Sequence, residues 1–353
     1  MSQPTNTQPT TDLPLPFVFI QMALGNRISQ SIYAAAKLGI ADLLKDGAKS
    51  CEELASATQT HERSLYRLLR ALASVGIFAE TEPGYFTLTP LANYLQSDVP
   101  DSLKAIAIMN GEEQYRSWGD LMYSLQTGES AFERLYGMNL FEYYAQNPEA
   151  AKIFNQAMTT SSVLEDASVV SDYDFSNIQT LVDVAGGHGK LLTDILKANP
   201  KIKGILFDQP SVIAGATSLI EEAGVSDRCE LAQGSFFESV PAGADAYILK
   251  HIIHNWDDER AMAQSARFAI AILKRCHEAM PEHGKLLIVE QVIPPGNQPF
   301  FAKLIDLHML VICPGGCERT EQEYRTLMEK AGFQLIKIVP TQSPVSVIEG
   351  VPV

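Results

Sequence analysis

The chain has 353 residues, of which 46% are hydrophobic and 20% charged, and this is enough for two domains with substantial cores. Its 27 Lys and Arg against 42 Asp and Glu give a formal net charge of −15. Because binding to phosphate groups is mainly electrostatic, this charge argues against nucleic acid or an anionic membrane as a partner. A small molecule or another protein chain is expected instead.

The N-terminal end is predicted to be a disordered tail over residues 1–15, since it is polar and rich in Thr, Gln and Pro. No Lys or Arg precedes Arg27, so the basic start of a signal peptide is missing. No apolar run approaches the roughly 18 residues that a membrane span needs. Five scattered cysteines give neither a disulfide framework nor a zinc pattern, so no metal is expected. These features predict a cytoplasmic protein.

Residues 16–100 are predicted to form a winged-helix domain. Apolar positions at mixed three and four spacing indicate helices over residues 16–46. Ser50 and Glu53 fit a capping box that starts a short helix, and a second helix is predicted over residues 61–75. A Pro-Gly turn between two short apolar segments then predicts a β-hairpin. Helix, turn, helix and hairpin together make a winged-helix unit.

Such a unit can bind DNA, and Arg63, Arg67 and Arg70 share its second helix. We interpret these arginines as a solvated helix face, because the chain as a whole is strongly acidic. Residues 101–165 are predicted to be a helical linker region. Aromatic residues recur along it, and some of them are expected to line the substrate pocket.

Residues 166–353 are predicted to form an α/β domain, because strand patterns alternate with helix patterns there. Such alternation is typical of a doubly wound, Rossmann-like sheet with helices on both faces. The predicted strands cover residues 181–184, 204–207, 229–232, 246–249, 285–290, 334–339 and 345–349. The predicted helices cover residues 189–198, 210–222, 258–280 and 320–331.

A glycine turn follows the first of these strands, in the segment Leu181-Val-Asp-Val-Ala-Gly-Gly-His-Gly189. Gly186 and Gly187 let the backbone turn tightly and approach a ligand, and the next helix offers unpaired amides. Asp208, after the second strand, is placed to accept hydrogen bonds from two ribose hydroxyls. An adenosine-type cofactor is therefore expected. The dinucleotide pattern lacks its third glycine, which favours S-adenosylmethionine, and Asp183 is a candidate to organise its amino-acid end.

A second segment supplies a candidate base. His254 lies four residues beyond Lys250, just past the fourth predicted strand, and an acidic helix start follows it. A neutral imidazole at this position is suited to taking a proton from a phenol near pH 7. We interpret the other histidines of this domain as hydrogen-bonded structural residues: His188, His251, His277, His283 and His308.

Five segments together carry a resemblance to a known family. They are the glycine turn quoted above, Phe207-Asp-Gln-Pro-Ser-Val-Ile213, Gly234-Ser-Phe-Phe237, the run from Ala244 to Glu259, and Gly315-Gly-Cys-Glu-Arg-Thr-Glu321. In order and spacing they resemble the plant-type small-molecule O-methyltransferases. That group is dimeric and includes caffeate and hydroxyindole O-methyltransferases and bacterial enzymes that tailor natural products. The resemblance spans nearly the whole chain, including the winged-helix region.

The resemblance implies a catalytic trio. His254 would be the base that deprotonates the acceptor hydroxyl. Glu290 and Glu318 match the family's two acids beside that histidine. A carboxylate on the far imidazole nitrogen would hold the tautomer and stabilise the cation that forms.

The resemblance also implies where the cofactor and the acceptor bind. The turn at Gly186 and Gly187 would approach the cofactor, Asp208 would bind the ribose, and Lys250 would lie near the nucleoside. Ser235 and Phe236 would surround the adenine, and Met309 and Asp306 would contact the acceptor.

Several features depart from the family pattern. Ser235 stands where an aspartate is common, and Asn255 replaces an aspartate beside the base. Ala185 replaces a frequent glycine, a change that is tolerable with a negative backbone φ. An apparent insertion near residues 262–269 continues an apolar helix face and is predicted to lengthen the helix that follows. A local bulge is the alternative.

The sequence therefore predicts an O-methyltransferase that uses S-adenosylmethionine, needs no metal and methylates a hydroxyl of a small, aromatic metabolite. A homodimer is expected, because the N-terminal helices carry more apolar surface than a winged helix covers and related enzymes dimerise there. The alternatives are an N-methyltransferase or another S-adenosylmethionine-using relative, a winged-helix regulator that senses S-adenosylmethionine, and a nicotinamide dehydrogenase. Retention of His254, Glu290 and Glu318 favours methylation of oxygen.

Overall fold

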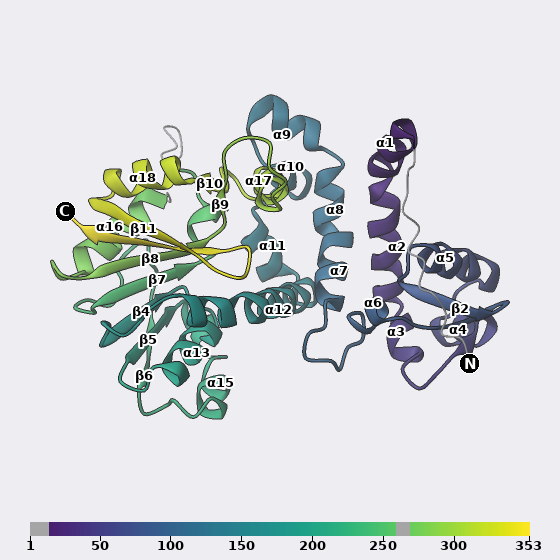
Figure 1. The fold of residues 1–353 in the computed structure, drawn as a ribbon, viewed down its shortest axis with the longest axis horizontal. Helices are drawn as coiled ribbons and strands as arrows, with labels where there is room; N and C mark the ends of the chain where they lie inside the picture. Colours follow the sequence, from purple (N-terminus) through teal and green to yellow (C-terminus); the bar gives the residue numbers. More distant parts are fainter. Residues whose placement is uncertain (1–13, 259–268) are drawn as a thin grey trace. The chain divides into compact units, whose positions relative to one another are not determined.

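The computed structural model describes residues 14–258 and 269–353 (Figure 1). The chain divides into two compact units, residues 1–112 and residues 113–353. Among the described residues, no helix is both long and apolar enough to cross a bilayer.

The first unit contains the winged helix. Its short helix starts with the predicted capping box: Ser50 Oγ accepts from Glu53 N at 3.1 Å, and Glu53 Oε2 accepts from Ser50 N at 2.7 Å. Its helices are α1 (Leu15–Ala23), α2 (Gly25–Lys37), α3 (Ile40–Leu43), α4 (Cys51–Thr58), α5 (Glu62–Ser74), α6 (Pro90–Asn93) and α7 (Lys104–Gly111). Its sheet has the order β1 (Lys49–Ser50), β3 (Tyr85–Leu88), β2 (Phe78–Glu82).

Helix α1 carries a large exposed apolar surface. Leu15 is 82% exposed, Phe19 72% and Met22 78%, and no residue of this helix is buried in the single chain. Exposed apolar surface of this extent is typical of a face that another chain covers.

The second unit begins with a helical region. Its helices are α8 (Glu113–Trp118), α9 (Leu121–Thr127), α10 (Ala131–Tyr136), α11 (Leu140–Gln146) and α12 (Pro148–Asp172). The breaks have a local cause, because Gly128 and Gly137 end α9 and α10 with left-handed φ values of 71° and 72°. Helix α12 runs without interruption across residue 165, where a domain boundary was predicted, and that boundary stays a prediction.

A seven-stranded sheet follows, and its strands agree with the seven predicted from sequence within one residue at each end, except that the last strand ends three residues later than predicted. The order is β11-β12-β8-β7-β4-β5-β6, and the five strands from β8 to β6 are parallel. The strands are β4 (Thr180–Val184), β5 (Lys203–Asp208), β6 (Cys229–Gln233), β7 (Ala246–Lys250), β8 (Lys285–Glu290), β11 (Phe333–Pro340) and β12 (Ser346–Pro352). The doubly wound fold class is thereby confirmed.

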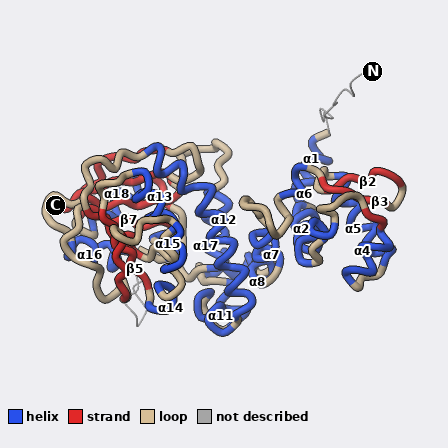
Figure 2. Tube along the Cα trace, turned by 90° about the horizontal axis from the view of Figure 1, so that it is seen from below, coloured by secondary structure: helices blue, strands red, loops and turns tan. Residues whose placement is uncertain are grey.

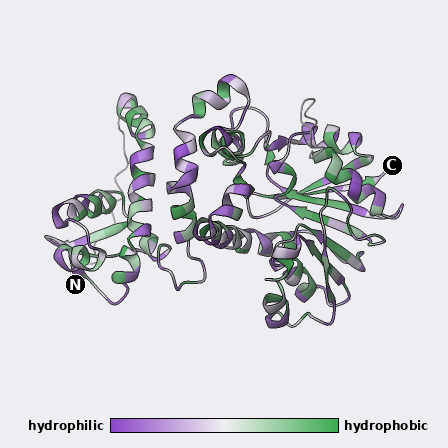
Figure 3. Cartoon of the chain, turned by 180° about the vertical axis from the view of Figure 1, so that it is seen from behind, coloured by the Kyte–Doolittle hydropathy of each residue, from purple (hydrophilic) through white to green (hydrophobic). Residues whose placement is uncertain are grey.

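Helices cover both faces of this sheet (Figure 2). Alternate residues of its strands belong to two separate hydrophobic cores. One core contains Val182 with residues of α16 and α18, and the other contains Leu181 with residues of α13 and α15. The strands are accordingly among the most hydrophobic parts of the unit in Figure 3. The remaining elements are α13 (Lys190–Ala198), α14 (Pro210–Ile213), α15 (Thr217–Glu222), η1 (Ile253–Asn255), α16 (Ala269–Ala279), β9 (Val292–Ile293), α17 (Ala302–Ile312), β10 (Arg319–Thr320) and α18 (Glu321–Lys330).

Of the predicted helices, one is divided in the structure and another lies partly outside the described residues. The helix predicted over residues 210–222 is wrong as a single element, because turns at residues 214–216 separate α14 from α15. The lengthened helix predicted for residues 262–269 lies almost wholly outside the described residues. Within the described residues, helix α16 covers Ala269–Ala279, and the amide of Ala269 donates to Asp257 O at 3.0 Å.

The order of the strands indicates where in this sheet a ligand binds. Strand β4 has β5 on one side and β7 on the other, so the chain leaves β4 and β7 in opposite directions across the sheet. In doubly wound sheets ligands bind at the carboxyl ends of such diverging strands. The glycine turn that begins at Ala185 follows β4, and the segment from Lys250 to His254 follows β7.

Candidate active site

Three elements bring His254, Glu290 and Glu318 together. His254 lies on the 3-10 turn η1 after β7, Glu290 ends the neighbouring strand β8, and Glu318 precedes β10. Strands β9 and β10 pair in parallel, with Arg319 opposite Val292. This short ladder places the chain after Glu318 beside the chain after Glu290.

The imidazole of His254 is bound by Glu318. Its Nδ1 lies 2.8 Å from Glu318 Oε1, and the side chains are 12% and 0% exposed. A buried carboxylate at Nδ1 holds the proton on that nitrogen and leaves Nε2 as the basic atom. Burial by itself would lower the pKa of His254, but the hydrogen bond to Glu318 and the charges of Glu290 and Glu318 raise it above its ordinary value.

Glu290 acts on the backbone of the same turn. Its Oε1 accepts from His254 N at 3.0 Å, and its Oε2 accepts from the hydroxyl of Tyr324. The carboxylate is fully buried because β8 ends directly against η1. Of the two predicted acids, only Glu318 therefore binds the imidazole ring, whereas Glu290 fixes the turn that carries it.

Arg319 is a positioning residue that the sequence reasoning missed. Its side chain is 1% exposed, and its guanidinium donates to Trp256 O at 2.8 Å and to Asp258 Oδ1 at 2.7 Å. It therefore ties the segment after η1 to the strand that follows Glu318. A signal was present in the sequence, because Arg319 directly follows the predicted catalytic acid Glu318.

The glycine turn is built around Asp183. A Cβ on Gly186 would lie 2.4 Å from Asp183 Cγ, so only glycine fits there. Asp183 is 2% exposed, and its Oδ2 has no hydrogen-bond partner among the described residues. Burial raises the pKa of this carboxyl to about 7, although Lys250 opposes the shift. An unpaired buried carboxylate oxygen fits a ligand that brings positive charge or N–H donors, as the amino-acid end of S-adenosylmethionine does.

Asp208 closes the turn from the next strand. Its Oδ2 accepts from Gly187 N at 2.9 Å, and its Oδ1 accepts from Gln209 N at 2.6 Å. Burial raises the pKa of Asp208, although these two amides oppose the shift. Asp208, the residue predicted to bind the ribose, therefore lies beside the predicted glycine turn. Two backbone amides orient its carboxylate oxygens.

The predicted adenine residues lie beyond β6. Ser235 Oγ accepts from Phe237 N at 3.3 Å, and the rings of Phe236 and Phe237 meet edge to face at 4.6 Å. Phe237 also meets Trp256 at 5.0 Å. These aromatic contacts join the segment after β6 to the segment after η1.

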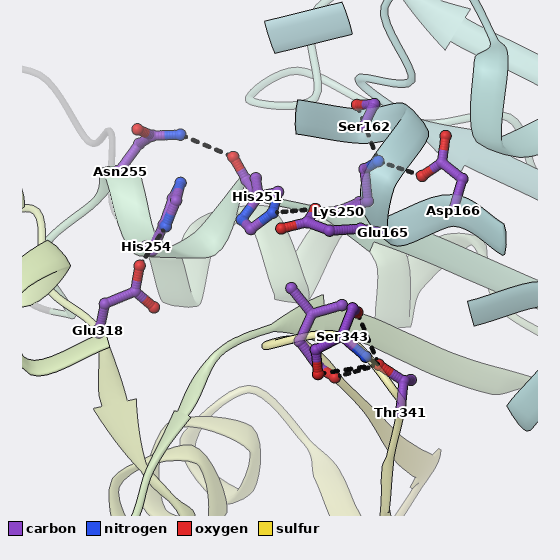
Figure 4. Close-up of polar contacts among 11 residues, drawn as sticks. Ser162, Glu165, Asp166, Lys250, His251, His254, Asn255, Glu318, Thr341 and Ser343 are labelled. Carbon is purple, nitrogen blue, oxygen red and sulfur yellow. Dashed lines mark hydrogen bonds and ion pairs between the residues drawn. The ribbon is translucent and has the colours of Figure 1, made fainter. Parts of the chain in front are cut away.

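Lys250 is held by helix α12. Its Nζ pairs with Asp166, which is fully buried, and donates to Ser162 Oγ at 2.9 Å (Figure 4). The other oxygen of Asp166 has no partner among the described residues. The sequence placed Lys250 near the nucleoside, and that role stays a prediction. Asp166 was not singled out, because nothing local shows which strand end its helix will face.

Ala185 does not meet the condition of a negative φ under which alanine would replace the family's glycine without strain. Its φ is +58°, and its amide donates to Phe207 O at 2.7 Å, which ties the turn to β5. Ala185 is the single residue between the end of β4 and Gly186, so its left-handed conformation turns the chain from the strand into the glycine turn. Alanine in this conformation costs about 1–2 kcal/mol relative to the right-handed region, which explains why the resembling family often has glycine there.

Helix α17 contributes Met309, His308 and Asp306. Met309 is 6% exposed and packs in a largely aromatic cluster with α8, α10 and α11. His308 Nδ1 accepts from Trp118 Nε1 at 3.0 Å, and burial lowers the pKa of His308 to about 4. Asp306 Oδ1 accepts from Glu318 N at 2.9 Å. Asp306 was predicted to contact the methyl acceptor, and one of its carboxylate oxygens positions the catalytic acid Glu318.

A second imidazole lies next to the base. His251 Nε2 is 2.7 Å from Glu165 Oε2, and the rings of His251 and His254 lie 5.1 Å apart at 31° (Figure 4). His251 had been interpreted as structural, and Glu165 had not been singled out. Their spacing in sequence, 86 residues, gives no local signal.

The fold and this site define a class of protein. A doubly wound sheet, a glycine turn against a buried acid, and a carboxylate-bound imidazole at the diverging strands are the parts of a Rossmann-like methyltransferase with a histidine base. Among the described residues, no group of three or more His, Cys, Asp or Glu side chains could hold a metal ion.

The family follows from comparison with known proteins. Residues 118–334 match the O-methyltransferase domain, and residues 20–98 match the O-methyltransferase dimerisation domain. The chain belongs to this O-methyltransferase family. The prediction of a homodimer is confirmed by the dimerisation domain, whose match includes the last four residues of the exposed helix α1.

Several curated relatives match over most of their length. A phenazine O-methyltransferase from Lysobacter antibioticus is 48% identical over 97% of both chains. A 3-amino-4-hydroxybenzoate 4-O-methyltransferase from Streptomyces cremeus is 39% identical over 90% of this chain and 84% of that one. A phenazine-1-carboxylate N-methyltransferase from Pseudomonas aeruginosa is 31% identical over 91% of this chain and 92% of that one.

Solved structures of O-methyltransferases have a fold similar to that of this chain. The mitomycin 7-O-methyltransferase has a TM-score of 0.87 at 34% identity and covers 96% of this chain and 98% of its own. An O-methyltransferase from neocarzinostatin biosynthesis, solved with S-adenosylmethionine and 2-hydroxy-5-methyl naphthoic acid, has a TM-score of 0.80 at 31% identity, covering 92% and 96%. This chain is accordingly an O-methyltransferase that uses S-adenosylmethionine, as predicted.

Proposed function

We propose that the chain methylates a phenolic hydroxyl of a fused, nitrogen-containing aromatic metabolite of the phenazine class. The observation that carries the catalytic part is the 2.8 Å contact between Glu318 and Nδ1 of His254, at the diverging end of β4 and β7. The acceptor class is supported by 48% identity over nearly the whole length to a phenazine O-methyltransferase.

The chain's own residues act as base, support and binding surface. Glu318 keeps the proton on Nδ1, so Nε2 of His254 takes the proton of the acceptor hydroxyl. Glu290 and Arg319 fix the turn that carries the ring, so the base has one position. The raised pKa of His254 makes its neutral form a stronger base.

The cofactor and the acceptor would be held by neighbouring residues. Asp183 and the Gly186 turn would hold the amino-acid end of S-adenosylmethionine, and Asp208 would hold its ribose. When bound, this cofactor supplies an electrophilic sulfonium methyl group. Met309 and the aromatic cluster around it would pack against the flat face of the acceptor.

The test is direct. The purified protein is incubated with S-adenosylmethionine carrying a labelled methyl group and a panel of hydroxyphenazines, hydroxybenzoates and hydroxynaphthoates. Mass spectrometry should find an O-methylated phenazine as the best product. Turnover of only the single-ring or naphthoate acceptors would overturn the acceptor class.

Methylation of nitrogen is the second candidate, because a relative with the same domain arrangement is named as a phenazine N-methyltransferase. A hydroxyphenazine offers both kinds of acceptor atom in one molecule. The position of the label in the product, read by fragmentation or NMR, separates the two. The carboxylate-bound base favours oxygen, because a ring nitrogen has no proton to remove.

We also infer a cytoplasmic location. All five cysteines are free thiols, and Cys51, Cys276 and Cys313 are buried, which is usual for a protein of a reducing compartment. Fractionation of the producing cell, with activity followed in each fraction, tests this location.

A further inference from the structure

We propose that His251 and Glu165 form a specificity-determining pair that selects acceptors with a second polar substituent next to the methylated hydroxyl. This inference rests on the proposed function and concerns which aromatic acceptors the site prefers. The pair is separate from the His254–Glu318 pair, and no step of proton removal uses it.

The first observation is the pairing itself. Glu165 projects from α12 and His251 from the end of β7, and their Oε2 and Nε2 atoms lie 2.7 Å apart. The Glu165 side chain is 12% exposed and that of His251 is 26% exposed. The pair is therefore enclosed enough to be strong and accessible enough for a small ligand to reach it.

The second observation is that the fold maintains His251 in an unfavourable conformation. Its φ is +54°, which is rare for a residue with a side chain. Its amide donates to Val289 O at 3.2 Å, and its carbonyl accepts from Asn255 Nδ2 at 2.9 Å. Backbone strain held by surrounding contacts in this way is concentrated at functional sites.

The third observation is the distance to the base. The rings of His251 and His254 lie 5.1 Å apart and are tilted by only 31°, so an aromatic acceptor at His254 has His251 beside it. Figure 4 shows His251 and His254 on the same segment, with each ring held by its own carboxylate, Glu165 or Glu318. A group on the next ring carbon of the acceptor would thus meet the second pair.

The fourth observation is what the pair can offer. Burial raises the pKa of Glu165, but the charge and hydrogen bond of His251 outweigh burial, so the net shift is downward and the carboxyl is ionised. One carboxylate oxygen of Glu165 binds His251. The Nδ1 atom of His251 is buried and has no hydrogen-bond partner in the part of the chain that the structure describes. A carboxylate with an imidazole can bind a neighbouring hydroxyl, amino or oxo group, whereas an alkyl group would leave the polar atoms unpaired.

The experiment compares two acceptors of matched size, 1,2-dihydroxyphenazine and 1-hydroxy-2-methylphenazine. The wild-type chain should prefer the dihydroxy compound by roughly ten- to hundredfold in kcat/KM, as expected for a hydrogen bond to a charged group. Glu165→Leu and His251→Phe should make the two acceptors nearly equal, mainly through a higher KM for the dihydroxy compound. Glu165→Gln should retain part of the preference, because an amide still accepts a hydrogen bond.

Controls separate selection from folding. Glu149→Gln removes an exposed acid from the same helix and should leave the preference unchanged. Cofactor affinity measured by calorimetry should be the same in every variant, which shows that the fold is intact. If Glu165→Leu does not fold, His251→Phe and Glu165→Gln carry the test.

Two results would overturn the inference: equal use of both acceptors by the wild-type chain, or an undiminished preference in the folded variants. Turnover of neither phenazine by the wild-type chain would instead contradict the proposed function.

Discussion

Glu318 lies 2.8 Å from Nδ1 of His254 although 64 residues separate them in sequence, and its carboxylate is fully buried. The contact fixes which ring nitrogen is basic. The base and the carboxylate that holds it therefore come from two different loop segments, the turn η1 after β7 and the residue before β10.

Replacing His254 with Ala should lower kcat by about 10²–10⁴-fold, the usual contribution of a positioned general base. Cofactor affinity should stay within experimental error, because the glycine turn and Asp183 belong to another strand end. Steady-state kinetics and calorimetry check the two halves of this prediction. Full turnover by the variant at neutral pH would show that His254 is not the base.

Replacing Glu318 with Gln should move the pH profile of kcat. The acceptor reacts with neutral His254, so activity rises with pH through a pKa that lies above the ordinary value of 6.5. Without the carboxylate that raises this pKa, the rise should occur at lower pH. A profile with the same midpoint in both proteins would contradict the assignment of the contact.

Cofactor affinity should itself depend on pH through Asp183. The pKa of this carboxyl is about 7, so its negative charge develops as the pH rises through that value. A cationic cofactor should then bind more tightly, by roughly tenfold across the transition. Calorimetric titrations with S-adenosylmethionine on either side of pH 7 measure the effect. The Asp183→Asn variant should bind S-adenosylmethionine weakly, with an affinity that does not change with pH.

Replacing Ala185 with Gly should stabilise the chain by roughly 0.5–1 kcal/mol. Glycine relieves the left-handed strain at a φ of +58°, and this gain exceeds the extra entropy that glycine loses on folding. Urea unfolding of the two proteins, compared in midpoint and slope, measures the difference. A less stable glycine variant would mean that the methyl group makes contacts worth more than the strain.

Replacing Tyr324 with Phe should destabilise the chain by about 1–3 kcal/mol. The Tyr324 hydroxyl donates to Glu290, and its loss leaves a fully buried carboxylate oxygen without that donor. Thermal unfolding checks the prediction, with Tyr94→Phe as a matched change at an exposed tyrosine. Equal melting temperatures for both variants would show that Glu290 is satisfied without Tyr324.

The sequence alone determined the elements and the residue types at their ends. The seven strands, the glycine turn after β4 and the histidine after β7 all follow from local patterns, because periodicity and turn chemistry act over a few neighbouring residues. The charge of the chain and the capping box at Ser50 are equally local. These features were enough to indicate an adenosine-type cofactor and a base.

The tertiary structure alone decided which residues meet. It placed Glu318 on the ring of His254 and Glu290 on its backbone, paired Glu165 with His251 across 86 residues, and gave Ala185 a left-handed φ. Such relationships depend on how a helix packs over the end of a strand from a distant part of the chain. A sequence pattern shows that a side chain faces inward, but its partner is determined by the packing of the elements around it.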